Sequence, residues 1–485
     1  MIEDKYGITI GLEIHAQLLT STKIFCSCDA NVFDREPNSS ICPVCTGQPG
    51  ALPVLNEEVV RKAVMAALAL NCKINRYSRF DRKNYFYPDL PKGYQITQYF
   101  YPIAENGYLN IKIGEGNKKI RIRRLHIEED AGKMLHSSDN ITQATHSLVD
   151  LNRCGIPLIE IVTEPDIESP IEARLFMEKL RDILRYIDVC TGDMEKGALR
   201  CDANISIYNK ETLERSSRVE VKNINSFRFV EKALDFEADR IKKMMEKGER
   251  VEQETRGWDF SSRSTVSMRS KEEESDYRYF PEPDLPPLIV SEDYINELKE
   301  KLPELPDEKI QRFQSEYNLL EYDATVLSSS KKLADFFEDC VRLYNNPKRL
   351  SNIIINDLLS LLNEHNVEID GTKIRPEAIV KIAKLIDSSK ISASNAKSIL
   401  EETFKTGKDP QDIVKEKRLE QIDDEEFLNK IIEKVIQQNS KAVEDYRKGK
   451  KGVVGFLVGM VMRETRGKAN PKVVSQMIES KLNES

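Results

Sequence analysis

Two residues that could do chemistry stand close together near the start of the chain, Glu13 and His15. In residues 8–15 apolar side chains alternate strictly with the others. A period of two is typical of a half-buried β-strand, whose successive side chains point to opposite faces. Glu13 and His15 therefore share the face opposite the apolar residues. A carboxylate and an imidazole on one sheet face suggest a site for a divalent cation and its nucleotide.

Three later segments repeat this alternation, each with a carboxylate on the polar face: residues 125–130 with Glu128, residues 199–207 with Asp202, and residues 218–222 with Glu220. The apolar residues change phase near Arg123, which predicts a bulge that could also bring Glu129 to the polar side. Residues two apart on a strand are about 7 Å apart, so a shared ion needs ligands from neighbouring strands. Carboxylate oxygens are ligands that Mg²⁺ prefers. The alternative is that these acids form only a solvated outer face.

Four cysteines form two short pairs, Cys26 with Cys28 and Cys42 with Cys45. Two such pairs can close a tetrahedral Zn²⁺ site. Four sulfur ligands leave no open coordination position, so we expect a structural site. The first spacing is tighter than the usual two-residue gap, and the alternative is a set of free thiols in a loop.

An aromatic and basic stretch covers residues 79–95. Prolines and a glycine in its second half predict a loop there. Rings beside lysine and arginine suit a nucleotide base or a tRNA 3′ end, so we expect Tyr85 and Tyr87 to contact tRNA. The alternative is a well-packed structural loop. Further along, Ser169, Pro170 and Glu172 predict the start of a helix.

The composition describes a globular protein of several domains, because 485 residues are too many for one core. Apolar residues make up 40% and charged residues 32% of the chain, with no run of about 18 apolar residues. We therefore expect no membrane span and no secretion leader. Nine cysteines, an odd number in a long chain, are more consistent with a reducing cytosol than with a disulfide scaffold. These features favour a cytoplasmic protein.

Seven segments together resemble the B subunits of the bacterial aspartyl/glutamyl-tRNA amidotransferases: residues 11–15, 81–89, 150–165, 199–204, 222–226, 268–272 and 276–284. The C-terminal region resembles this family as well. The resemblance and the pattern of elements imply an α+β fold, with a glutamine-synthetase-like cradle built on an antiparallel sheet over residues 1–291. Two all-α domains follow, residues 292–406 and a tail domain of the YqeY-like type over residues 407–485. Proline-rich residues 281–287 and the break at residues 407–410 suggest these boundaries.

The resemblance implies a kinase for an esterified amino acid. ATP would phosphorylate the side-chain carboxylate of Glu-tRNA(Gln) or Asp-tRNA(Asn), and ammonia would displace the phosphate. In the heterotrimer that the resemblance implies, a glutaminase or A subunit would supply the ammonia, while a small C subunit would brace the pair. The sequence agrees, since it holds no amidase signature, no glutaminase-like cysteine setting, no P-loop and no Rossmann fingerprint. A partner is therefore required.

The resemblance also assigns roles to residues in these segments. The expected Mg²⁺ ligands are Glu13, His15, Glu128, Glu129, Asp202 and Glu220, and the expected catalytic residues are Glu13, His15 and Glu129. The expected ATP-binding residues are Lys83, Arg153, Arg200 and Lys222. The resemblance supports zinc at the four cysteines.

The last residues are basic although the chain carries a net charge of −8. Residues 440–485 hold ten basic and five acidic side chains. Affinity for phosphates depends on local fields rather than on net charge. Charge alone favours a solvated helical face, but the resemblance favours tRNA contacts from Lys448, Lys450, Lys451 and Lys468.

Two other functions stay open at this point. One is a non-catalytic tRNA scaffold whose acidic face holds a structural ion. The other is an independent ligase that uses ATP, free ammonia and a small carboxylic acid. A basic tail domain disfavours the second, because a small substrate does not need it. We expect neither a membrane nor DNA as a partner.

Overall fold

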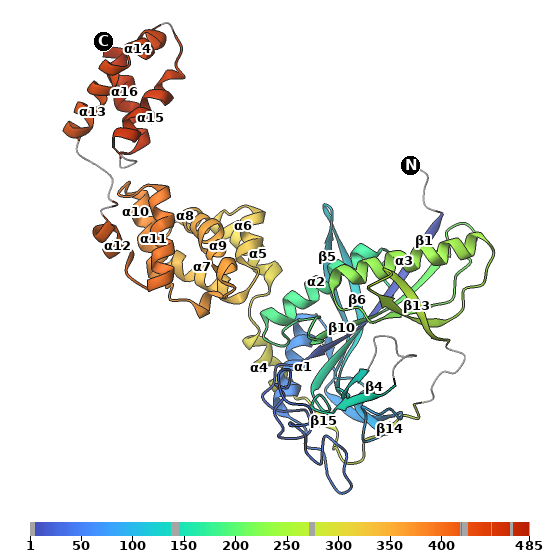
Figure 1. Ribbon diagram of the computed structural model, residues 1–485. Helices are drawn as coiled ribbons and strands as arrows, with labels where there is room; N and C mark the ends of the chain where they lie inside the picture. Colours follow the sequence, from blue (N-terminus) through green and yellow to red (C-terminus); the bar gives the residue numbers. More distant parts are fainter. Residues whose placement is uncertain are drawn as a thin grey trace. The chain divides into compact units, whose positions relative to one another are not determined.

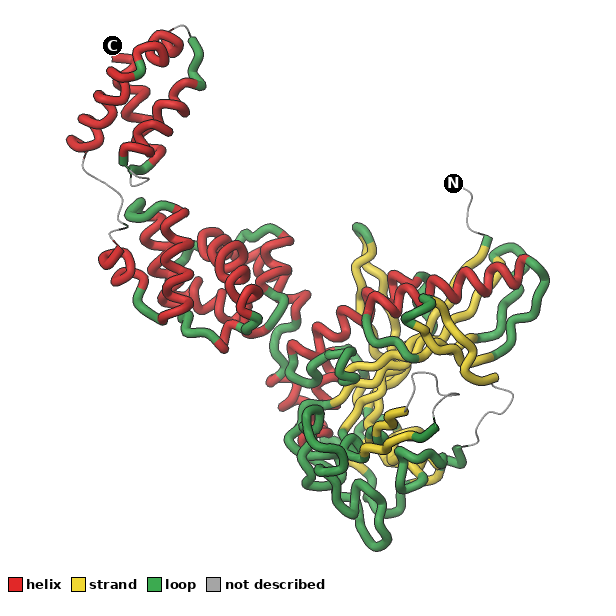
Figure 2. The backbone as a smooth tube through the Cα atoms, in the orientation of Figure 1, coloured by secondary structure: helices red, strands yellow, loops and turns green. Residues whose placement is uncertain are grey.

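The computed structural model describes residues 5–136, 145–270, 277–417, 419, 425–447, 449–465 and 469–484. The chain divides into two compact units, Met1–Leu305 and Pro306–Ser485. The first unit contains the β-sheet, and the second is helical (Figures 1 and 2). The expected order of an α+β region followed by helices is confirmed at this level, while the glutamine-synthetase-like cradle stays a prediction.

The first unit contains fifteen strands and four helices among its described residues. The strands are β1 (Tyr6–Gln17), β2 (Lys73–Ile74), β3 (Tyr77–Asn84), β4 (Tyr94–Tyr101), β5 (Ala104–Ile113), β6 (Gly116–Glu129), β7 (Lys133–His136), β8 (Ser147–Asp150), β9 (Pro157–Thr163), β10 (Leu199–Asn209), β11 (Val219–Lys222), β12 (Glu254–Asp259), β13 (Ser264–Ser270), β14 (Phe280–Pro281) and β15 (Leu288–Ile289). The helices are α1 (Glu57–Ala69), α2 (Pro170–Tyr186), α3 (Phe227–Glu246) and α4 (Glu292–Lys301).

Thirteen of the described strands form one large sheet, and β7 and β8 pair separately. The main path of the sheet runs β13-β12-β11-β10-β1-β9-β6-β4-β3-β14. The pairing of β11 with β12 is parallel, and the other pairings along this path are antiparallel. Strand β1 thus lies between β10 and β9, with β6 next to β9.

The alternation of β1 gives the sheet one buried face. Ile10, Leu12 and Ile14 are buried in the hydrophobic core, together with residues of α1, α2 and α3. Helices α2 and α3 lie along this face (Figure 1). As predicted, Pro170 is the first residue of α2, and the Ser169 side chain caps it by accepting from the Glu172 N–H. The polar face opposite these helices is left for the site.

Two other sequence predictions, a bulge near Arg123 and a loop after residue 84, are confirmed. The register between β6 and β9 shifts between Ile122 and Arg124, which is the bulge predicted near Arg123. Strand β3 ends at Asn84, and residues 85–93 form a loop, since Pro88 and Pro91 cannot continue a paired strand.

The second unit is built from helices throughout its described residues. They are α5 (Pro306–Tyr317), α6 (Glu321–Leu327), α7 (Lys331–Leu343), α8 (Pro347–Asn352), the π-helix η2 (Ile353–Leu358), α9 (Leu359–His365), the 3₁₀-helix η3 (Ile369–Gly371), α10 (Pro376–Asp387), α11 (Ala393–Thr406), α12 (Pro410–Lys417), α13 (Glu425–Gln438), α14 (Ser440–Arg447), α15 (Val453–Glu464) and α16 (Pro471–Glu484).

Two separate hydrophobic clusters stabilise these helices. One involves residues 313–414 and the other residues 428–482. Gly407 ends α11 in the left-handed conformation, where a glycine carries no steric penalty. The division into three domains at residues 291 and 406 stays a prediction. Among the described residues, no helix has both the length and the apolar character needed to cross a membrane.

Candidate functional site

Three glutamates and two histidines from three adjacent strands form an acidic cluster on the polar face of the sheet. Glu13 and His15 come from β1, Glu160 from β9, and His126 and Glu128 from β6. The His15 Nε2 lies 3.3 Å from Glu128 Oε1 and 3.4 Å from Glu160 Oε2. The His126 Nε2 lies 3.4 Å from the same Glu160 oxygen. Glu160 therefore stands between the two imidazoles.

The register of the sheet explains why these side chains meet. His15 pairs with Glu160 across β1 and β9, and Glu160 pairs with His126 across β9 and β6. Directly paired residues carry their side chains on the same face, about 5 Å apart at Cβ. The same rule brings Glu13 beside Asp202, its partner on β10. Residues two apart on one strand are too far apart to share an ion, but paired residues on neighbouring strands are close enough.

Burial and charge act against each other in this cluster. Burial alone would lower the pKa of His15, but the hydrogen bond to Glu160 and the charges of Glu128 and Glu160 raise it to about 9. The pKa of His126 is also raised, because the same two carboxylates outweigh its burial. Burial would raise the pKa of Glu160, but the two histidines hold it well below its usual value. Burial and the charge of Glu160 raise the pKa of Glu13.

A second group of charges lies one strand further along the same face. The Lys222 Nζ lies 2.6 Å from Asp202 Oδ2 and 3.4 Å from Glu220 Oε1. The other Glu220 oxygen accepts a 2.7 Å hydrogen bond from the buried Thr255 hydroxyl. Burial would lower the pKa of Lys222, but the charges of Asp202 and Glu220 raise it. The Lys222 ammonium is thus fixed in position by Asp202 and Glu220.

Asp130, which immediately follows β6, holds the two arginines expected to bind ATP. Its Oδ2 accepts from the Arg200 guanidinium at 2.8 Å and from the Gln17 amide at 3.1 Å, and it lies 3.5 Å from Arg153 Nε. Burial would raise the pKa of Asp130, but the charges of Arg200 and Arg153 lower it. Arg153 also donates to the carbonyls of Ala131 and Gly132. Both arginines are therefore fixed in direction.

The donor set of the cluster fits a divalent cation. Glu13, His15 and Glu160 offer ligand atoms within 4.8 Å of one another, and so do His126, Glu128 and Glu160. Carboxylate oxygens suit Mg²⁺, which usually keeps waters and phosphates as further ligands. Asp202 and Glu220 lie near this set but contact Lys222 in the structure.

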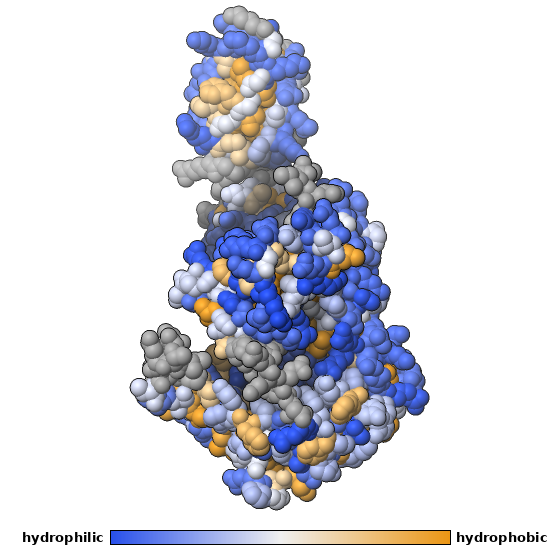
Figure 3. All heavy atoms as spheres, turned by 90° about the vertical axis from the view of Figure 1, so that its right-hand side faces the viewer, coloured by the Kyte–Doolittle hydropathy of each residue, from blue (hydrophilic) through white to orange (hydrophobic). Residues whose placement is uncertain are grey.

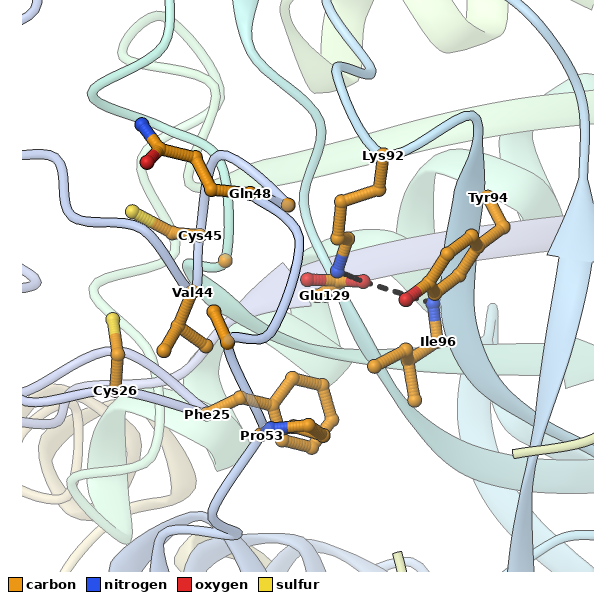
Figure 4. Close-up of a pocket in the computed structure, with 13 residues that line it drawn as sticks. Phe25, Cys26, Val44, Cys45, Gln48, Pro53, Lys92, Tyr94, Ile96 and Glu129 are labelled. Carbon is orange, nitrogen blue, oxygen red and sulfur yellow. Dashed lines mark hydrogen bonds and ion pairs between the residues drawn. The ribbon is translucent and has the colours of Figure 1, made fainter. Parts of the chain in front are cut away.

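Glu129 lies apart from this cluster and faces a small cavity of about 50 Å³. Its carboxylate pairs with Lys92 and accepts from the Ile96 N–H at 2.9 Å. Figure 4 shows Lys92 reaching Glu129, with Cys26 and Cys45 elsewhere around the same cavity. The structure does not bring Glu129 together with Glu13 and His15.

The four cysteines do come together. All four Sγ atoms of Cys26, Cys28, Cys42 and Cys45 lie within 4.8 Å of one another. The Sγ atoms of Cys42 and Cys45 are 3.9 Å apart, close to the ~3.8 Å expected for tetrahedral Zn–S bonds of about 2.3 Å.

The pKa values of the thiols differ within this group. The hydrogen bond from Cys26, with the Cys42 N–H and the charge of Lys23, lowers the pKa of Cys45 to about 5. Burial and a hydrogen bond with Cys42 raise the pKa of Cys28 to about 11. Four sulfurs this close together are a donor set that fits Zn²⁺.

The residues expected to contact the nucleotide or tRNA near β3 differ in exposure. The Lys83 Nζ lies 4.8 Å from the centre of the Tyr277 ring and 5.9 Å from that of Tyr85. Burial raises the pKa of Tyr85, whereas Tyr87 is 55% exposed. Tyr87 is therefore the more accessible of the two rings.

The basic tail is only partly described. Lys450 and Lys451 are exposed between α14 and α15, and Lys450 Nζ lies 3.2 Å from Asp445. Lys448 and Lys468 lie outside the described residues. Apolar side chains also gather on the surface of the C-terminal helices (Figure 3). Phe427 of α13 and Phe456 of α15 are about half exposed.

Two residues at the centre of the cluster, His126 and Glu160, were not among the predicted site residues. In residues 125–130 His126 is two residues from Glu128, so the same alternation puts both on the polar face. For Glu160 the signal was weaker, because it lies between Ile159 and Ile161 in a strand whose residues are nearly all buried. A charge inside such an apolar run is itself a pointer to a partner.

The comparisons with known proteins agree over nearly the whole chain. Residues 8–296 match the family described as the GatB/GatE catalytic domain, and residues 335–482 match the GatB domain. The B subunit of the aspartyl/glutamyl-tRNA(Asn/Gln) amidotransferase of Thermotoga petrophila is 64% identical over 478 residues, covering 99% of both chains. The proteins of the same name from Pseudothermotoga lettingae and Carboxydothermus hydrogenoformans are 59% and 52% identical, covering 98% and 99% of both chains.

Proposed function

The chain belongs to the family of aspartyl/glutamyl-tRNA(Asn/Gln) amidotransferase B subunits, and from this premise we propose that it activates an aminoacyl-tRNA with ATP. The substrate is the side-chain carboxylate of Glu-tRNA(Gln), of Asp-tRNA(Asn), or of both. A carboxylate oxygen attacks the γ-phosphorus of ATP, and ADP leaves. Ammonia then attacks the acyl phosphate, and inorganic phosphate leaves as the amide forms.

The observation that carries this proposal is the cluster around Glu160. Two sets of three potential ligands share this carboxylate, on strands β1, β6 and β9. When bound there, Mg²⁺ would supply positive charge that offsets the negative charge of the phosphate oxygens during phosphoryl transfer. The His15 Nε2 lies 3.3 Å from Glu128 Oε1 and 3.4 Å from Glu160 Oε2, so this imidazole contacts both carboxylates.

The cations at the rim of the cluster bind and orient the phosphates. Lys222 and Arg200 are already oriented by Asp202 and Asp130. A guanidinium fixed in direction suits the planar recognition of phosphate oxygens. Because these contacts exist before the nucleotide binds, less order has to be created when it does.

The remaining expectations belong to the same proposal. A glutaminase partner, the A subunit, supplies the ammonia, and a small C subunit completes the complex. Zn²⁺ at Cys26, Cys28, Cys42 and Cys45 has a structural role, and the first unit has the glutamine-synthetase-like cradle form. The tail helices contact tRNA. The reaction takes place in the cytoplasm, where aminoacyl-tRNA is used.

The test is phosphoryl transfer without an ammonia source. The chain, with its A and C partners, is incubated with γ-labelled ATP and Glu-tRNA(Gln) in the absence of glutamine. We expect label on the aminoacyl group, and its loss in Glu13→Ala with tRNA affinity largely kept. The matched control is Glu249→Ala, which changes an exposed glutamate in a loop. If ATP stays intact while tRNA binds, the chain is a scaffold. If the label appears instead on a free carboxylic acid supplied in place of the tRNA, the chain is an independent ligase.

A further inference from the structure

We propose that Lys23 is the charge-compensating residue of a metal–tetrathiolate centre at Cys26, Cys28, Cys42 and Cys45. This inference rests on the proposed metal at the four cysteines, and it is independent of the proposed phosphorylation. It assigns a role to a lysine that lies outside the acidic cluster.

The position of Lys23 is unusual for a charged side chain. It is fully buried, at 0% exposure, and is among the largest side chains that are buried to this degree. Its Nζ donates to the Ser40 carbonyl at 2.8 Å and to Cys45 Sγ at 3.6 Å. Lysine is almost never fully buried unless it is paired, so its partner here needs explanation.

A neutral thiol is a poor partner for a buried ammonium. A carbonyl supplies a hydrogen bond but no net charge, and an S–H group is only a weak acceptor. The burial of a charge is costly unless an opposite charge and hydrogen bonds compensate it. Lys23 therefore indicates that the sulfur cluster carries net negative charge.

A metal–tetrathiolate centre has the required charge. Four thiolates around one divalent cation leave a net charge of −2, and the thiolate is the form that binds metal. The described thiols form no disulfide. Disulfides would be uncharged and could not compensate the lysine. Lys23 can offset one of the two negative charges, as hydrogen-bond donors around metal ligands commonly tune their centres.

The backbone around Lys23 holds the ammonium at this position. The Lys23 N–H donates to the Cys28 carbonyl at 2.9 Å, so one cysteine pair and the lysine are joined directly. The Ser40 N–H, next to the other pair, donates to Asn152 Oδ1 at 2.7 Å. At Gly155, which has φ +78°, an added Cβ would lie 3.4 Å from Cys45 Cβ and 3.6 Å from Lys23 Cδ. The lysine is thus enclosed between the two cysteine pairs and residues 152–155.

The first test measures metal affinity. Full-length wild type, Lys23→Met and Lys23→Arg are loaded with Zn²⁺ or Co²⁺, and affinity is determined by competition with a chelator. We expect about a 10–100-fold loss of affinity in Lys23→Met, as for other partners of metal ligands, and a smaller loss in Lys23→Arg. The thiolate–Co²⁺ absorption should keep its shape, since all four ligands remain.

The matched control is Lys62→Met. Lys62 is also buried, at 6% exposure, but its Nζ donates to the Asp188 carbonyl rather than to a cysteine. We expect this variant to lose stability and to keep the wild-type metal affinity. Equal affinity in wild type and Lys23→Met would overturn the role of Lys23. A wild type that binds no metal would overturn the centre itself, whatever the phosphorylation assay shows.

A second test needs no variant and applies even if Lys23→Met does not fold. Wild type is treated with an amine-acetylating reagent before and after removal of the metal, and the labelled lysines are mapped by mass spectrometry. We expect Lys23 to be protected with metal and labelled without it, while Lys62 stays protected in both. Unchanged protection of Lys23 after metal removal would contradict the proposal.

Discussion

Replacing Asp130 by asparagine should destabilise the first unit in a pH-dependent way. The change keeps the shape of the side chain but leaves Arg200 and Arg153 without their carboxylate partner. Asp130 is 4% exposed, so the remaining guanidinium charges face a poorly solvated site. The single amide oxygen of asparagine can still accept from Gln17, but it cannot also replace Oδ1, which accepts from the Ala131 N–H.

The size of the effect follows from how exposed the partners are. Removal of one member of a buried pair costs about 3–5 kcal/mol, whereas exposed pairs contribute about 0–1 kcal/mol. The side chains of Arg200 and Arg153 are 34% and 30% exposed, which places this pair between the two cases. We therefore expect Asp130→Asn to lose about 2–3 kcal/mol of unfolding free energy at pH 7.

The single tryptophan gives a probe that reports this unit. Trp258 is 2% exposed and belongs to the same hydrophobic core as the sheet. Its fluorescence during urea unfolding therefore reports the unfolding of the first unit alone. A probe of the whole chain would mix the transitions of the two units.

The pH dependence has a definite sign. The pKa of Asp130 is lowered in the folded state, so its stabilisation is present above the unfolded pKa of about 3.9 and is lost as pH falls through the folded pKa. The difference between wild type and Asp130→Asn should stay constant from pH 8 to about 5 and narrow below that. As a control, Asp182→Asn, an exposed partner of Arg181, should change stability by less than about 0.5 kcal/mol. No difference in unfolding free energy at pH 7, or a difference that persists unchanged in acid, would show that the Asp130 charge does not stabilise the folded state.

Four further predictions concern other parts of the chain. Glu160→Gln should weaken Mg²⁺-dependent ATP binding at least about 10-fold, which is the smallest effect typical of residues that hydrogen-bond to metal ligands. Titration calorimetry measures the affinity, and unchanged binding would contradict a role for Glu160. Cys42→Ser should reduce bound zinc well below one per chain by elemental analysis, and full occupancy would argue against the four-cysteine site. Neutralising both Lys450 and Lys451 should lower the salt dependence of tRNA binding by about 2 in log–log slope, and an unchanged slope would exclude phosphate contacts there. Phe313→Ala, at a fully buried ring, should destabilise the helical unit by about 3–5 kcal/mol, measured by circular dichroism, and a loss below about 1 kcal/mol would show that this core is loosely packed.

The strands of the site could be predicted because their signal is local. The period-two pattern around Glu13 and Asp202 depends only on neighbouring residues, and both alternations are present in β1 and β10. Pairing depends on contacts between distant segments, so no local pattern reveals that His15 lies opposite Glu160. Glu160 gave a weaker signal, because nearly all residues of β9 are buried and its two faces differ less than those of β1.

The position of Glu129 could not be predicted from the sequence for a second reason. The bulge near Arg123 was predicted and is present, but a bulge alone does not decide which groups each later side chain contacts. The carboxylate of Glu129 instead meets Lys92, which the loop after β3 supplies from a distant part of the sequence. The cysteine pairs were easier, since two short spacings already hold each pair together.

An oxygen-isotope experiment shows whether the substrate carboxylate is activated by phosphorylation. Glu-tRNA(Gln) carrying ¹⁸O in its side-chain carboxylate is amidated by the complex of this chain with the proposed A and C partners. The phosphate released is analysed by mass spectrometry. If the carboxylate attacks the γ-phosphorus, one ¹⁸O must pass into inorganic phosphate for each amide formed, and Glu160→Gln should lower both products together. Amide formation with no ¹⁸O in inorganic phosphate, or with ¹⁸O in AMP, would contradict activation by phosphorylation at this site.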